Sequence, residues 1–70
     1  MKASFQERLK ELREERNLSQ AQLSNALENK ISASAIGKWE LGERTPNLDA
    51  VILLAEFFGV SIDYLAGREN

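Results

Sequence analysis

The sequence predicts an all-α fold, in which five short helices pack into one compact domain. Apolar residues recur at the three- and four-residue spacing of amphipathic helices throughout the chain. Serine or asparagine, the residues that cap helix starts, precede these apolar stretches. The chain has 70 residues, a single proline and no low-complexity run, which suits one domain without an internal linker.

Each expected helix has its own start and stop signals. The first runs from about Ser4 to Arg16, because Ser4 can form a capping box with Glu7 and Asn17 can end the helix in the left-handed conformation. The other four follow a capping residue and end near a turn or a glycine. The second is expected at 20–27 with Ser19 as its cap, and the third begins after its cap Ser32 and ends at Leu41, before Gly42. The fourth runs from its cap Asn47 to Phe58, before Gly59, and the short fifth helix is capped by Ser61 and closed by Gly67.

The apolar residues of these helices predict one shared core, centred on the helix at 47–58, which is hydrophobic over more than half its circumference. The residues expected to face inward are Phe5, Leu9 and Leu12, then Leu23, Ala26 and Leu27, then Ile36 and Trp39, then Leu48, Val51, Ile52, Leu54, Ala55 and Phe58, and finally Ile62 and Leu65. Phe57 is a separate case, because it and Phe58 cannot face one core equally. One of the two either packs internally or, with Val60, Ile62 or Tyr64, forms a dimer surface.

The composition excludes most kinds of chemistry. Without cysteine or histidine there are no disulfides, thiolate metal sites, thiol nucleophiles or imidazole acids and bases. Glu11, Glu14 and Glu15 alternate with basic residues, as on a solvated helix face. We therefore expect no enzyme, no metal and no cofactor. The longest apolar run, 50–55, is far below the roughly 18 residues of a membrane span, and the N-terminus lacks a signal-peptide stretch, so we expect a cytoplasmic protein.

The charge distribution gives a weak indication of nucleic-acid binding. The net charge is −2, but residues 1–44 hold eight basic and seven acidic residues, whereas residues 45–70 hold one and four. Binding to DNA requires local rather than global positive charge. The outward side of the third expected helix has small or basic residues, Ala33, Ser34, Gly37 and Lys38, and no acid before Glu40. Such a surface suits close approach to base edges in the major groove.

Two charged residues lie at the edges of buried stripes. Arg13 follows Leu9 by four residues, and Glu40 follows Ile36 by four. A buried charge requires a partner, so the spacing leaves two alternatives: the two side chains pair, or both turn outward to solvent. The segment from 19 to 41 also has two interpretations, an ordinary helical hairpin or a helix-turn-helix that binds DNA.

Four motifs in order resemble the Cro/CI-type, or XRE-like, helix-turn-helix family of phage and bacterial repressors. The motifs are LSQAQL at 18–23, AIGKWELG at 35–42, RTPNL at 44–48 and LAEFFGVSIDYL at 54–65. The resemblance covers about residues 5–67. It implies a five-helix, repressor-type DNA-binding domain, with the helix-turn-helix formed by the second and third helices. Residues 67–70 would be a frayed tail or the start of a linker.

The resemblance also implies roles for individual residues. Arg13 matches the arginine that pairs with the glutamate of the W-E motif, here Glu40, and this structural ion pair would orient the recognition helix. Base contacts are expected from Ala33, Ser34 and Lys38. The resemblance implies phosphate contacts from Gln20, which would also support a residue of the recognition helix, and from Arg44 in the loop before Pro46. Further phosphate contacts are expected from the start of the second helix, where backbone N–H groups are free, and from the turn before the third. The residues expected at phosphates are Ser19, Gln20, Asn29, Lys30, Ser32 and Arg44.

The sequence departs from the family pattern in three places. The turn before the third helix is about two residues longer than the common form, which would add a phosphate contact or tilt the recognition helix. Ala33 and Ser34 stand where relatives often have glutamine or arginine, so direct readout would depend on Ser34 and Lys38, with DNA shape contributing. Gly37 lies inside the recognition helix, either as a tolerated surface glycine or for close approach to a DNA backbone.

These observations predict a sequence-specific transcriptional regulator that binds double-stranded DNA, a repressor acting by operator occupancy. A homodimer would bind inverted half-sites, with no membrane and no small-molecule ligand involved. The alternative is a protein–protein interaction module on the same scaffold, with weak or lost DNA binding. The net charge of −2 and Ala33 on the recognition helix motivate that alternative.

Overall fold

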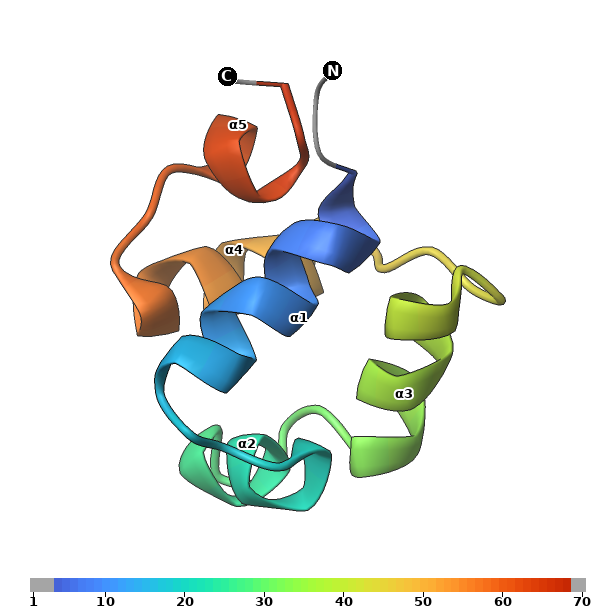
Figure 1. Cartoon of the computed structure of the whole chain (residues 1–70), viewed down its shortest axis with the longest axis vertical. Helices are drawn as coiled ribbons and strands as arrows, with labels where there is room; N and C mark the ends of the chain where they lie inside the picture. Colours follow the sequence, from blue (N-terminus) through green and yellow to red (C-terminus); the bar gives the residue numbers. More distant parts are fainter. Residues whose placement is uncertain (1–3, 69–70) are drawn as a thin grey trace.

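The computed structural model describes residues 4–68, and these residues form five helices and no strand (Figure 1). The helices are α1 (Phe5–Glu15), α2 (Gln20–Ala26), α3 (Ala33–Leu41), α4 (Leu48–Phe58) and α5 (Ile62–Leu65). The all-α, five-helix prediction is confirmed, and the predicted ends agree to within two residues. In Figure 1, α1 crosses the centre of the molecule, with α4 behind it, α2 and α3 toward one end and α5 at the other.

Local hydrogen bonds define the start of every helix. In each case the predicted cap residue is extended, and its side-chain oxygen accepts a hydrogen bond from a backbone N–H three residues on. The cap residues are Ser4, Ser19, Ser32, Asn47 and Ser61. Gly42 and Gly59 end α3 and α4 in the left-handed conformation, with φ of 76° and 70°.

All five helices share one hydrophobic core. The largest fully buried side chains are one leucine or isoleucine from each helix: Leu9, Leu23, Ile36, Leu54 and Leu65. Each such side chain contributes about 1.5–3 kcal/mol by leaving water. Because every helix supplies one, no helix can detach without exposing part of the same core.

Three residues expected in the core, Ala26, Leu48 and Ile62, are exposed instead; Ile62 is the first residue of the short α5 and is 41% exposed. Ala26 lies on the solvent side of α2, because the buried face of that helix turns toward Ser24, whose hydroxyl donates to the Ile31 carbonyl at 2.7 Å. Leu48 is 65% exposed because it is the first residue of α4, and the buried part of that helix begins in the next turn.

Arg8 of α1 and Arg16, the residue that ends this helix, cover aromatic rings from the C-terminal part of the chain. The Arg8 guanidinium lies 3.9 Å from the centre of the Tyr64 ring, and Arg8 is only 7% exposed. Arg16 lies 5.1 Å from the Phe57 ring, which itself packs edge-on against Phe58. Such cation–π contacts stabilise helix packing. Phe57 therefore takes part in internal packing.

Among residues 4–68, no helix has the length and apolar character needed to cross a bilayer.

Candidate nucleic-acid interface

One side of α3 is buried and the opposite side is open to solvent. Ile36 and Trp39 are buried, and the Trp39 ring packs edge-on against Phe5 at 6.2 Å, so it belongs to the core. Ser34, Lys38 and Leu41 recur every three or four residues along the opposite side and are all exposed. We call these three residues the outward stripe. Ala33, also predicted to contact bases, is half-buried beside the stripe.

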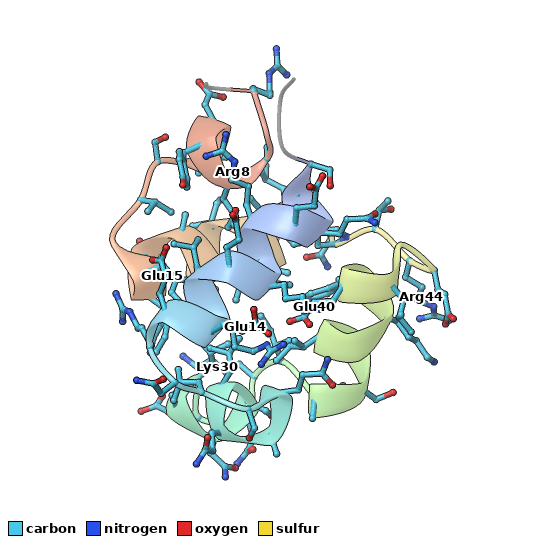
Figure 2. All side chains as sticks on the ribbon, in the orientation of Figure 1. Arg8, Glu14, Glu15, Lys30, Glu40 and Arg44 are labelled. Carbon is cyan, nitrogen blue, oxygen red and sulfur yellow. The ribbon has the colours of Figure 1, made fainter. Side chains whose placement is uncertain are left out.

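The only acidic residue of α3, Glu40, turns away from the outward stripe and toward α1 (Figure 2). Arg13 of α1 contacts it through two hydrogen bonds, Nε to Oε2 at 2.7 Å and Nη2 to Oε1 at 2.8 Å. The side chains are 11% and 6% exposed, respectively. Arg13 also donates to the Leu18 carbonyl at 2.8 Å. The paired arrangement is therefore the one present, and it joins α1, the α1–α2 turn and α3.

The ion pair shifts the pKa of both partners. Burial disfavours the charged form of Glu40, but hydrogen bonds from Arg13 and Gln20 outweigh burial and hold its pKa below the ordinary value of 4.5. The hydrogen bond to Glu40 raises the pKa of Arg13. Glu40 is therefore a carboxylate at neutral pH, and its negative charge is neutralised locally rather than presented to an anionic ligand.

Gln20, the first residue of α2, also joins this network. Its Nε2 donates to Glu40 Oε1 at 3.2 Å, and its side chain lies over Gly37 of α3. A β-carbon at Gly37 would lie 3.1 Å from Gln20 Oε1. Gly37 therefore makes room for a side chain of its own protein. Neither sequence interpretation of this glycine identified that contact.

The turn between α2 and α3 is held in an unusual backbone conformation. Glu28 and Asn29 are successive left-handed residues, with φ of 59° and 61°. Asn29 N–H donates to the Ser24 carbonyl at 2.9 Å, and the Ser24 hydroxyl anchors the end of the turn at Ile31. The longer turn is thus a fixed part of the fold, and it exposes Lys30 and Asn29.

The predicted phosphate-contacting residues lie on both sides of the outward stripe. Asn29, Lys30, Ser32 and Arg44 line a groove of about 750 Å³ that Ala35 also lines. Gln20 lies on the other side of the stripe, where its side chain covers Gly37. Because helical residues are rotated by about 100° from one to the next, Ala35 and Gly37 occupy opposite flanks of the stripe. Figure 2 shows Arg44 beyond the outer side of α3.

The capping serines keep a hydrogen-bond donor for a ligand. Ser19 and Ser32 accept backbone N–H groups through their hydroxyl oxygens, at 3.0 Å each, and a hydroxyl that accepts can still donate its own hydrogen. The sequence predicts Leu41 only as the last residue of the third helix, and the structure adds it to the outward stripe, where it is 72% exposed. The spacing from Ser34 and Lys38 was the signal that places it there.

Comparison with known proteins agrees with this architecture. The sequence pattern of the helix-turn-helix family matches residues 9–65. The chain is 42% identical over 66 residues to the HTH-type transcriptional activator BcrR of Enterococcus faecalis, covering 94% of this chain and 31% of that protein. It is 38% identical over 64 residues to the HTH-type transcriptional regulator AnsR of Bacillus subtilis, covering 91% of this chain and 53% of that protein.

These relatives are longer than the present chain. It spans about a third of BcrR and about half of AnsR. The match nevertheless includes all of α2 and α3, the turn between them and most of the hydrophobic core. The chain therefore belongs to the helix-turn-helix family of DNA-binding transcription regulators.

Proposed function

We propose that this domain binds a specific double-stranded DNA operator, with α3 lying in the major groove. The observation that carries the proposal is the outward stripe of α3, which is exposed, contains no acid and has predicted phosphate contacts on both flanks. A duplex has a phosphate backbone on each side of its major groove, so one helix flanked in this way can be positioned by both strands. The site would lie in the bacterial cytoplasm, where the DNA is accessible.

The residues of this interface fall into two groups, those that contact bases and those that contact phosphates. Lys38 donates to guanine O6 or N7, Ser34 bonds to several bases, and Ala33 contacts a thymine methyl group. Leu41, at the end of the stripe, would make a second apolar contact with a thymine methyl group. Ser19, Gln20, Asn29, Lys30, Ser32 and Arg44 contact phosphates.

Two substitutions test this division of roles. Lys38→Ala should weaken binding by about 1–3 kcal/mol and relax the preference at one base pair of each half-site. Arg44→Ala should weaken binding to all sequences nearly equally, because a phosphate contact carries no base information. Selection from random duplexes, followed by fluorescence-anisotropy titration, measures both effects.

Arg68→Ala is the matched control, since Arg68 is an exposed arginine at the α5 end of the chain. It should leave binding unchanged. Equal affinity of wild type, Lys38→Ala and Arg44→Ala for the selected site would defeat the assignment.

We further propose that two copies bind inverted half-sites whose centres lie about 34 Å apart, or a multiple of that spacing. The regulator would repress transcription by occupying a site that polymerase needs. In vitro transcription from a template carrying the selected site tests the sign of regulation. Activation on that template would contradict repression while leaving the DNA-binding assignment intact; one relative is named an activator.

A protein-interaction role is the second candidate. It is favoured by Leu41 and Leu48, which expose 72% and 65% of their surface. An interaction module would select no preferred duplex, and Leu41→Lys would abolish capture of its protein partner. A DNA-binding domain gives the opposite pattern: a preferred duplex and salt-sensitive binding.

A further inference from the structure

The orientation of the Gln20 side chain is fixed by its neighbour in the ion-pair network. Its amide nitrogen lies 3.2 Å from Glu40 Oε1, which also accepts from Arg13. An ionised carboxylate can only accept hydrogen bonds, so the amide must turn its nitrogen, and not its oxygen, toward Glu40. The carbonyl oxygen is consequently directed away from Glu40.

That oxygen lies directly over Gly37. Of the atoms that a β-carbon at Gly37 would meet, Gln20 Oε1 is the nearest at 3.1 Å, followed by Cδ at 3.6 Å and Nε2 at 3.7 Å. Gly37 has no positive φ, so its backbone does not require glycine. Glycine inside a helix is less stable than alanine. What the missing side chain provides is space for the Gln20 carbonyl.

The oxygen borders an open hollow where α1, α2 and α3 meet, which Lys10, Arg13 and Glu40 also line. Within residues 4–68, the hydrogen bond to Glu40 is the only one made by the Gln20 amide. Gln20 and Gly37 are both half-buried and line this hollow of about 290 Å³, together with Leu41 of the outward stripe. Ser34 and Leu41 are the helical neighbours of Gly37, three residues before it and four after it.

The chemistry of a carbonyl oxygen limits what it can contact on DNA. Phosphate oxygens are acceptors, and so are O6 and N7 of guanine, so none of these can bond to it. The hydrogen-bond donors that base pairs present in the major groove are the exocyclic amino groups, N6 of adenine and N4 of cytosine. One amide hydrogen of Gln20 remains for a phosphate, because only the other is donated to Glu40.

We propose that Gln20 and Gly37 act together as a specificity element: the Gln20 carbonyl oxygen, seated over Gly37, accepts a hydrogen bond from an adenine or cytosine amino group. This inference rests on the proposed function. Gln20 contacts the base, whereas Gly37 and Glu40 are positioning residues.

The test removes only the amino group from the DNA. Duplexes carrying the selected site are made with single adenines replaced by purine, or single cytosines replaced by 4-deaminocytosine, and titrated with wild type and Gln20→Ala. At one position per half-site, wild type should lose about 5- to 100-fold in affinity, because the Gln20 carbonyl is left desolvated without a donor. Gln20→Ala should bind the modified and unmodified duplexes equally. The analogue that gives the loss tells adenine from cytosine.

Gly37→Ala provides a second variant that preserves the amide but displaces it. It should melt within a few degrees of wild type, because the helix preference of alanine offsets the displacement of the Gln20 amide, and yet lose the same amino-group dependence. Gln6→Ala, which removes an exposed glutamine of α1, should keep that dependence.

The outcomes separate this inference from the proposed function. If wild type selects no duplex, the proposed function is wrong and the inference falls with it. If wild type selects a duplex but tolerates every amino-group deletion, or if Gln20→Ala shows the same losses as wild type, only the inference is overturned.

Discussion

Glu40 contributes to the fold through its charge, which is paired with Arg13 between α1 and α3. Glu40→Gln would leave the Arg13 guanidinium, 11% exposed, without its carboxylate partner. Loss of one member of a buried pair costs about 3 kcal/mol in the free energy of unfolding. Arg13 keeps its bond to the Leu18 carbonyl, so the loss should not be larger. Urea denaturation at neutral pH measures it, with exposed Glu56→Gln as the control.

The same pair predicts a pH dependence of stability. Because folding lowers the pKa of Glu40, its contribution is fully present above the ordinary value of 4.5 and is lost as pH falls through the lower folded-state pKa. Wild type should therefore lose more stability than Glu40→Gln when the pH falls from about 7 to about 3. Parallel pH profiles for the two proteins would contradict this linkage.

Whether a contact can be predicted from the sequence depends on how far apart its two partners lie along the chain. The five helix caps follow from sequence because a cap bonds to a backbone group only three residues away. The contact of Gln20 with Gly37 joins two helices, so it depends on how α2 and α3 pack, and no spacing rule contains it. The Arg13–Glu40 pair lies between these cases: spacing put both at core edges, but only family resemblance favoured their pairing.

At the scale of an element, the α2–α3 turn stores backbone strain. Glu28 has a side chain but a left-handed φ of 59°, a conformation that costs a non-glycine residue about 1 kcal/mol. Glu28→Gly should therefore raise the free energy of unfolding by about that amount. The Glu28–Lys30 ion pair, at 3.8 Å between two exposed side chains, adds little to stability, so its removal in Glu28→Gly should not offset this gain. Thermal or urea denaturation gives the measurement.

Glu28→Ala is the matched variant, because it removes the same charge and retains a β-carbon at the strained position. It should leave stability nearly unchanged. A gain from Glu28→Ala as large as that from Glu28→Gly would attribute the effect to charge rather than to backbone strain. The sequence identified the longer turn but not its two left-handed residues, because glutamate is not a residue that favours that conformation.

At the scale of the whole molecule, the small positive charge near α3 limits how salt-sensitive DNA binding can be. The net charge is −2, and two of the residues expected at phosphates, Lys30 and Arg44, carry a positive charge. Each cation that neutralises a phosphate contributes about −0.9 to the slope of log affinity against log salt concentration. Two copies on one operator should therefore give a slope of about −4.

A slope of that size corresponds to a loss of about 10²-fold in affinity between about 50 and 200 mM salt, at the low end for a specific regulator. Arg44→Ala should reduce the magnitude of the slope by about 2 for the pair of copies, and Arg68→Ala should leave it unchanged. Anisotropy titrations across the salt range measure these slopes. A wild-type slope near zero would mean that this face does not contact phosphates. A slope near −8 would mean that cations outside the two flanks of α3 also bind the backbone.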